Sequence, residues 1–259
     1  MRVILIICAA IIAVFAFIAV HALLKLRRRP IEQLYAKRAG QADFCPLDDI
    51  PERMTQLIIQ FEDMSFFEHH GIDVICIRQA LRRNLSERRI VSGGSTITQQ
   101  LIKNLYFHFH HSILRKIEEL ILVPFVEHRL GKRKILEFYL NIIYFGFGVY
   151  GIAGAARFYF NREPKELTLN QMFILARIPE APTRGDPIRH PEGFAKRRDK
   201  KLDYMVEQGQ ISAGEAEAIR AHPADCLDEQ LRANDAFTRE YPQDIVMINE
   251  RFGPFGSNA

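Results

Sequence analysis

Residues 93–104 read GGSTITQQLIKN, and this stretch marks the start of a helix. The two glycines let the backbone turn, and Thr96 with Gln99 matches a capping box, in which two side chains satisfy exposed backbone N–H groups. The free N–H groups of such a helix start favour an anion, and Lys103 adds a positive charge toward the same ligand. Taken alone, the pattern also fits an ordinary helix with a polar face.

Sequence signals for helix starts also occur elsewhere in the chain. Capping boxes recur at Thr168–Gln171 and Ser212–Glu215, and no run of alternating strands is present. Apolar stripes at helical spacing predict three core-facing segments, and Pro124 is expected to kink or divide the first of them. The stripes are Ile113, Ile117, Leu120, Ile121 and Pro124; Ile135, Leu136, Tyr139, Leu140 and Ile143; and Leu169, Met172, Phe173 and Leu175. The sequence therefore predicts a mainly α fold.

Composition points to one folded domain of ordinary size. The 259 residues are 48% hydrophobic and 25% charged, with a net charge of +4. Lysine and arginine gather in short runs, which suit an anionic membrane surface or a phosphate-bearing ligand, and no nucleic-acid motif is found. Cys8, Cys45, Cys76 and Cys226 lack the spacing of a zinc site, and the sequence leaves their pairing open.

The N-terminal segment from Val3 to Leu24 is almost unbroken apolar sequence. At about 1.5 Å per residue it can cross a hydrocarbon core of about 30 Å, so we interpret it as a transmembrane helix, with a cleaved signal peptide as the alternative. The expected organisation is a transmembrane anchor at 1–25, a linker at 26–48, the main folded domain at 49–210 and a C-terminal helical extension and tail at 211–259. The basic residues Lys25, Arg27, Arg28 and Arg29 favour a cytoplasmic domain by charge bias alone.

Three further stretches carry residues suited to chemistry. Residues 61–73 read FEDMSFFEHHGID, and a carboxylate held beside aromatic rings has a raised pKa, so Glu62 is a candidate general base. A helix-end cap or salt bridge is the simpler explanation of Glu62 alone. Residues 115–119 read RKIEE and place a cation and an acid on one helical face, which also fits an exposed ion pair. In residues 135–152, Asn141 with repeated glycines and aromatics predicts a tight turn after a helix.

In this order, the four stretches resemble the motifs of the family 51 glycosyltransferases, which polymerise peptidoglycan. The matches are EDxxFxxHxG at Glu62, Asp63, Phe66, His69 and Gly71; GGSTITQQ with its later lysine at Gly93 to Gln100 and Lys103; RKxxE at Arg115, Lys116 and Glu119; and ILExYLNxxYFGxGxxGI from Ile135 to Ile152. The resemblance covers about residues 49–205. It implies a lysozyme-like helical domain with a small membrane-associated jaw, preceded by one transmembrane helix.

The resemblance also implies roles for these residues. Glu62 would deprotonate the 4-hydroxyl of an incoming lipid II, and Glu119 would be a second acid or would organise the nearby cations. The substrate-binding residues would be Asp63, Phe66, His69, Ser95, Gln99, Gln100, Lys103, Arg115 and Lys116, with the last three neutralising the departing pyrophosphate. Some family members use a divalent cation, so Mg²⁺ or Mn²⁺ is compatible with the site, while no cofactor is certain and the metal ligands stay unknown.

Partners and location follow from the same resemblance. The expected partners are lipid II, the nascent glycan strand and the membrane, and they extend to transpeptidases or proteins of the division and elongation machinery, but not to nucleic acid. The catalytic domain would lie on the periplasmic side of the inner membrane as a single-pass protein, despite the basic cluster. No transpeptidase motif follows residue 205, which predicts a monofunctional enzyme.

The chain departs from the family pattern in several places. His111 stands where many members carry a phosphate-contacting arginine, which predicts weaker or pH-sensitive pyrophosphate binding. Residues 159–162 and 167–176 also differ from the family's later segments. Two alternatives stay open: a glycan-cleaving hydrolase with a lysozyme-like fold, and an inactive membrane-anchored scaffold.

Overall fold

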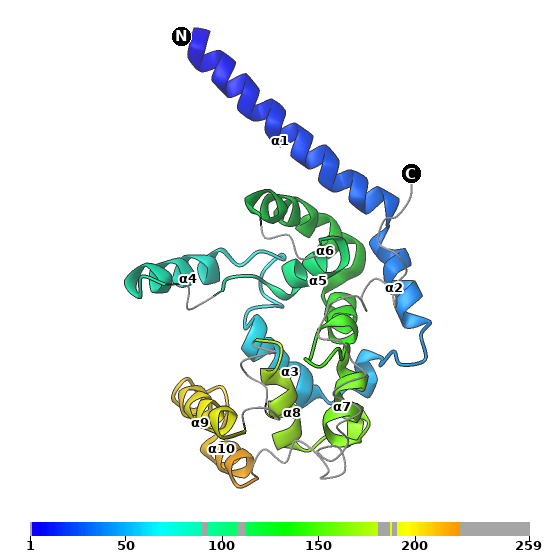
Figure 1. Ribbon diagram of the computed structural model, residues 1–259, viewed down its shortest axis with the longest axis vertical. Coiled ribbons are helices and arrows are strands. Elements are labelled where there is room, and N and C mark those ends of the chain that lie inside the picture. The colour runs from blue at the N-terminus through cyan, green and yellow to red at the C-terminus, as the bar shows by residue number, and fades with distance from the viewer. Residues whose placement is uncertain (1, 90–92, 108–111, 181–186, 188–190, 223–259) are drawn as a thin grey trace. The chain divides into compact units, whose positions relative to one another are not determined.

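The computed structural model describes residues 2–89, 93–107, 112–180, 187 and 191–222, and these are mostly helical (Figure 1). Within those ranges no β-strand is found, only an isolated bridge between Tyr144 and Tyr150. The helices are α1 (Arg2–Arg28), α2 (Ile31–Ala39), α3 (Glu52–Glu62), α4 (Val74–Ser86), α5 (Ile97–Tyr106), α6 (Ile113–Ile142), α7 (Ile152–Phe160), α8 (Leu169–Arg177), α9 (Pro191–Glu207) and α10 (Ala213–Arg220), with 3-10 turns η1 (Leu47–Asp49) and η2 (Pro164–Glu166). The predicted mainly α fold is confirmed.

The chain divides into two compact units. The first unit comprises residues 1–37 and 65–139, and the second comprises residues 38–64 and 140–259. The first therefore contains α1, α4, α5 and most of α6, and the second contains α3 and the helices from α7 onward. Each unit is described by itself below.

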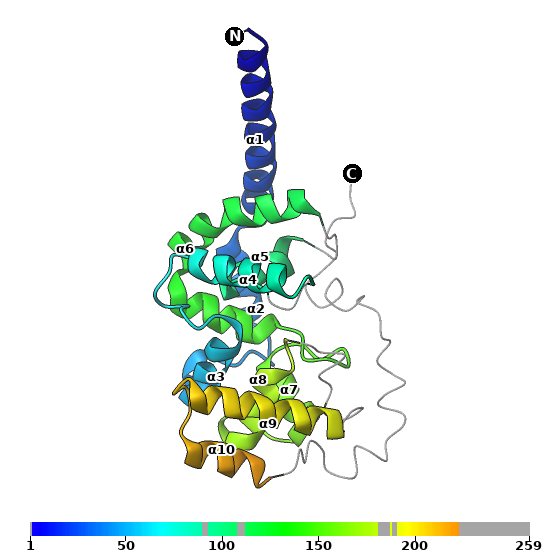
Figure 2. The same ribbon diagram turned by 90° about the vertical axis from the view of Figure 1, so that its left-hand side faces the viewer.

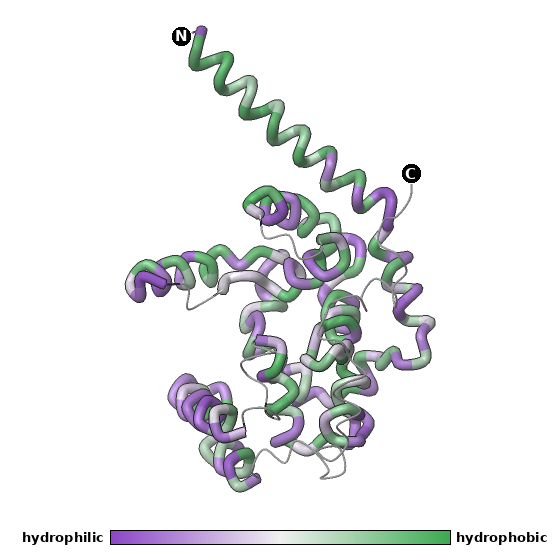
Figure 3. Tube along the Cα trace, in the orientation of Figure 1, coloured by the Kyte–Doolittle hydropathy of each residue, from purple (hydrophilic) through white to green (hydrophobic). Residues whose placement is uncertain are grey.

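Helix α1 is long and apolar enough to cross a membrane. Figure 3 shows hydrophobic residues along most of its length, and Val3 to Phe17 are exposed. Its buried residues, Ile18, Ala22 and Leu26, lie four residues apart on one face near its C-terminal end. The stretch predicted as a linker contains α2, whose Ile31 is fully buried.

Helix α6 differs from expectation in two ways. Pro124 lies inside the helix, and the non-helical backbone is found at Gly131, with φ 71° and ψ 164°. The division predicted at Pro124 is thus wrong, because the residue that can adopt positive φ is the glycine.

The first predicted apolar stripe is also misplaced. Ile113 is 81% exposed, and the residues of α6 that are buried are instead Glu118, Glu119, Leu122, Val123 and Val126. Apolar residues on both faces of this helix leave its periodicity ambiguous.

The second unit is built around contacts of α3 with α8, α8 with α10, and α10 with α9 (Figure 2). The predicted capping boxes at Thr168–Gln171 and Ser212–Glu215 open α8 and α10. Asn141 is buried and clasps the backbone of Cys45, accepting from its N–H at 2.8 Å and donating to its carbonyl at 2.8 Å. Within the described ranges, Cys8, Cys45 and Cys76 form no disulfide, and Cys226 lies outside those ranges.

Candidate functional site

The loop after α3 carries the first predicted motif. In the first unit, Phe66 is fully buried, and its ring lies edge-on to the rings of Phe67 and His69. The His69 ring nitrogen Nδ1 accepts a hydrogen bond from the Gly71 N–H at 2.9 Å. Gly71 has φ +85°, and a Cβ there would lie 2.4 Å from Val123 Cγ1, so only glycine fits this turn. Phe66 and His69 therefore fix the shape of the loop.

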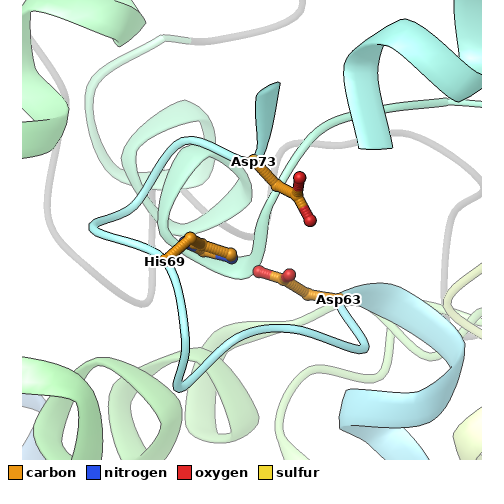
Figure 4. A group of neighbouring side chains, drawn as sticks. All are labelled: Asp63, His69 and Asp73. Carbon is orange, nitrogen blue, oxygen red and sulfur yellow. The ribbon is translucent and has the colours of Figure 1, made fainter. Parts of the chain in front are cut away.

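Asp73 closes this loop as the N-cap of α4 (Figure 4). Its carboxylate accepts from the Cys76 N–H at 2.8 Å and from the Ser65 hydroxyl. Burial alone would raise the pKa of Asp73, but these hydrogen bonds outweigh it and hold the pKa below its ordinary value. The carboxylate of Asp73 and the His69 ring offer ligand atoms within 4.8 Å of each other, and both atom types suit a divalent cation.

The second motif opens α5 as the sequence predicts. The Thr96 hydroxyl accepts from the Gln99 N–H, and the Gln99 side chain accepts from the Thr96 N–H. The same hydroxyl donates to the Gly71 carbonyl at 2.7 Å, so the first two motifs are joined. Gly94 packs against α4 so closely that a Cβ would lie 2.9 Å from Ile77 Cα. The start of α5 is therefore fixed by two contacts, one with the Gly71 loop and one with α4.

The third motif forms an ionic cluster on α6. Glu119 is 1% exposed, and its carboxylate pairs with Arg115 and, at 3.2 Å, with Lys116. The Lys116 ammonium also donates to the Ser95 hydroxyl at 2.9 Å and to the side-chain amide oxygen of Gln99 at 3.4 Å. The simple exposed ion pair that sequence allowed is therefore wrong, because the carboxylate is buried and its partner Lys116 also bonds to the second motif.

Two buried donors in this cluster have no hydrogen-bond partner among the described residues. They are Arg115 Nε and Gln99 Nε2. A buried N–H group without a partner costs about 1–3 kcal/mol, so such groups commonly belong to sites that a ligand completes. Both donors suit an anion. Lys103 is exposed on the same helix as Gln99, and Gln100 accepts from the Tyr139 hydroxyl at 3.1 Å.

Glu62 and Asp63 belong to the second unit. Glu62 is the last residue of α3 and is half-buried, and Asp63 is the C-cap of that helix. The preceding Phe61 ring lies edge-on to Phe173 at 5.3 Å, and the Lys201 ammonium lies 5.1 Å from its centroid. Glu62 thus ends α3 directly after Phe61, and its role as general base stays a prediction.

Some residues were missed or cannot be placed. Glu118, beside Glu119, is also buried, and its signal in the sequence was a pair of acids between the apolar Ile117 and Leu120 on a long helix. Tyr139 was predicted only as core, yet it holds Gln100. The predicted effect of His111 concerns a residue outside the described ranges.

Comparison with known proteins identifies the family. The model of the family described as Transglycosylase matches residues 27–206. The chain belongs to this family. The resemblance to family 51 glycosyltransferases is thereby confirmed.

Curated relatives agree with this assignment. Penicillin-binding protein 1F of Bacillus subtilis is 45% identical over 170 residues, which cover 66% of this chain and 24% of the relative. Penicillin-binding protein 1A of Escherichia coli is 35% identical over 214 residues, which cover 82% of this chain and 25% of the relative. Penicillin-binding protein 1A of Neisseria flavescens is 40% identical over 222 residues, which cover 84% of this chain and 27% of the relative. This chain thus spans about a quarter of the length of these relatives.

Proposed function

We propose that this protein is a peptidoglycan glycosyltransferase that polymerises lipid II into glycan strands. The observation that carries the proposal is the cluster of Arg115, Lys116 and buried Glu119, with two buried N–H donors awaiting an acceptor, in a member of the transglycosylase family. Such a cluster suits the diphosphate of a lipid-linked sugar donor.

In the proposed reaction, Glu62 removes the proton of the 4-hydroxyl of the acceptor N-acetylglucosamine. The resulting oxygen attacks the anomeric carbon of the donor N-acetylmuramic acid, and the bond from that carbon to the diphosphate breaks. The product is a new glycosidic bond with inverted configuration, and undecaprenyl diphosphate leaves with the electron pair. A half-buried carboxylate at the end of α3 supports a role as general base.

The cations of the first unit would neutralise the leaving diphosphate. Preorganised charges aimed at a developing anion contribute several kcal/mol, of order 3, to lowering a barrier. Both Arg115 and Lys116 are held by Glu119, which supports the organising role of Glu119 over that of a proton donor. Lys103 would add a further charge.

The other predicted residues would shape the substrate groove. Ser95, Gln99 and Gln100 would meet the sugar and phosphate groups, and Phe66 and His69 would hold the shape of their loop in the first unit. Asp63, in the second unit, would be a further substrate-binding residue. A divalent cation, Mg²⁺ or Mn²⁺, would supply extra charge at the diphosphate, and Asp73 and His69 are side chains of the type that hold such an ion.

The proposed location is the outer face of the cytoplasmic membrane, with α1 as the anchor. Its length and apolar composition support this, and the lipid carrier of the substrate requires a membrane. Transpeptidases are proposed partners, since the relatives are named penicillin-binding proteins. An alkaline phosphatase fusion after Gly40 tests the orientation, because the reporter is active only outside the cytoplasm.

The experiment that tests the function is polymerisation of labelled lipid II by the wild type and by Glu62→Gln. We expect glycan polymer from the wild type and less than about a tenth of that rate from the variant, with unchanged folding. Glu52→Gln, at the exposed opposite end of α3, is the matched control and should retain full activity. Shortened strands from finished glycan would instead support a hydrolase, and no reaction with either substrate would support a scaffold.

A further inference from the structure

The C-terminal turns of α1 are bonded to a buried carboxylate of α6. Glu118 is 7% exposed, and its two oxygens are taken by two residues of α1: His21 pairs with one, and the Lys25 ammonium lies 2.6 Å from the other. His21 and Lys25 are one helical turn apart, so both point to the same side of α1. The carboxylate is therefore fully engaged by the helix proposed as the anchor.

The end of α5 holds the same part of the chain. The Lys25 ammonium lies 4.3 Å from the centroid of the Phe107 ring, which follows the last residue of α5. The Tyr106 hydroxyl donates to the Arg29 carbonyl at 2.8 Å, directly after α1. On the same helix, Ile18, Ala22 and Leu26 are buried. A flexible tether would show none of these bonds.

Helices α5 and α6, which contact the C-terminal end of α1, also carry the proposed diphosphate-binding groups. Helix α5 bears Gln99 and Lys103, and α6 bears Arg115, Lys116 and Glu119. Glu118 is the direct neighbour of Glu119, so the carboxylate that meets α1 and the carboxylate that meets the cations lie on one rigid turn. A shift of α1 along its axis would move both helices with it.

We propose that Glu118, with Lys25 and His21, is a positioning device that sets the height of the cation cluster relative to the bilayer surface. This rests on the proposed function, because the ligand is the diphosphate of a lipid-linked donor. The apolar length of α1 fixes its depth in the hydrocarbon, since a mismatch in length costs energy. A docked α1 transfers that depth to Arg115 and Lys116, and a loosened α1 would leave the cations at variable heights.

The device predicts a specific kinetic signature. Removing the charge pair leaves the chemistry of Glu62 and Glu119 in place, so kcat should change less than about twofold. The cluster would meet the diphosphate in only part of the population, so the KM for lipid II should rise about tenfold. A merely structural defect would lower the amount of active enzyme, and hence kcat, without this split.

The test uses the full chain reconstituted in vesicles of phosphatidylethanolamine and phosphatidylglycerol. A fluorescent amino acid replaces the exposed Leu114, on the first turn of α6, and quenching by brominated lipids reports its depth. The variants are Lys25→Glu, Glu118→Gln and the swap Lys25→Glu with Glu118→Lys. The matched control is Glu127→Gln, which removes a mostly buried carboxylate of α6 that pairs with Lys132 and not with α1.

We expect both single variants to broaden or shift the probe depth and raise the KM, the swap to restore most of both, and the control to leave the depth unchanged. Unchanged depth and KM in the single variants, or failure of the swap to restore either, overturns the positioning role. A wild type that does not polymerise lipid II overturns the proposed function instead, and the depth measurement still decides on the docking of α1.

Discussion

The ammonium of Lys116 lies 3.2 Å from the carboxylate of Glu119, one turn further along α6. Since the same carboxylate pairs with Arg115 and is 1% exposed, it fixes both cations from inside the protein. Charges that are held in place before the reaction act on a ligand without reorganising at the moment of reaction.

Glu119→Gln is expected to lower kcat/KM for lipid II polymerisation about a hundredfold, because Arg115 and Lys116 lose the anion that orients them. Steady-state kinetics measure the effect, and Glu119→Asp, which keeps the charge, should lose less. Equal losses in the two variants would mean that side-chain length, not charge, matters at this position. Thermal unfolding of each variant controls for folding.

Gly94→Ala should destabilise the protein by about 1–3 kcal/mol, because the new Cβ would lie 2.9 Å from the Ile77 Cα and backbone cannot move aside cheaply. Gly93→Ala is the matched control. A Cβ there meets no described atom within 4 Å, so stability should change by less than about 0.5 kcal/mol. Urea unfolding of both variants decides, and equal midpoints would contradict the packing of α4 against this turn.

Asn141→Ala should cost about 2–4 kcal/mol of unfolding free energy, since it removes the partners of the Cys45 N–H and carbonyl, which are buried. Asn104→Ala, at a half-buried position on α5, should cost less than about 1 kcal/mol. Denaturant unfolding compares them. A small effect at position 141 would show that water replaces the side chain.

Acidification should weaken the start of α10. The hydrogen bond from the Ser212 backbone N–H, followed by the charge of Arg53, lowers the pKa of Glu215 below its ordinary value of 4.5. A carboxyl with a lowered folded-state pKa stabilises above its unfolded value, and this contribution is lost as the pH falls through the folded value.

Glu215→Gln should therefore be less stable than the wild type at pH 7, by less than about 1 kcal/mol, and the difference should shrink as the pH falls below 4.5. Thermal unfolding at pH 7 and at a pH below 4.5 measures the difference. Glu207→Gln, on the exposed surface of α9, serves as control and should match the wild type at both. A constant gap for Glu215→Gln across this range would exclude the charge as its cause.

Short-range chemistry was predictable from the sequence. The capping boxes at Thr96, Thr168 and Ser212 were found because each needs only residues three apart. The second apolar stripe, from Ile135 to Ile143, is buried as predicted. The third is buried in part, with Phe173 and Leu175 inside and Leu169 and Met172 half-buried.

Long-range pairing was not predictable. The apolar residues of α6 leave two faces that could be buried. The face that is buried carries Glu118, whose partners His21 and Lys25 lie far away in the sequence. Lys25 and Glu118 are 93 residues apart, and nothing local marks them as partners. Likewise, motif order indicated the cations and Glu119 together, but not the link from Lys116 to Ser95 or the link from Thr96 to Gly71.

The contact of α1 with Glu118 bears on how the protein is handled in the laboratory. Deleting residues 1–28 to avoid detergent would strip both partners from a carboxylate that has little access to water. A truncated form of this kind would leave the buried carboxylate of Glu118 without an ionic partner on α1, two residues after Lys116 in the sequence. Its weak activity would then be an artefact of truncation, and Glu118→Gln would be the repair to make first.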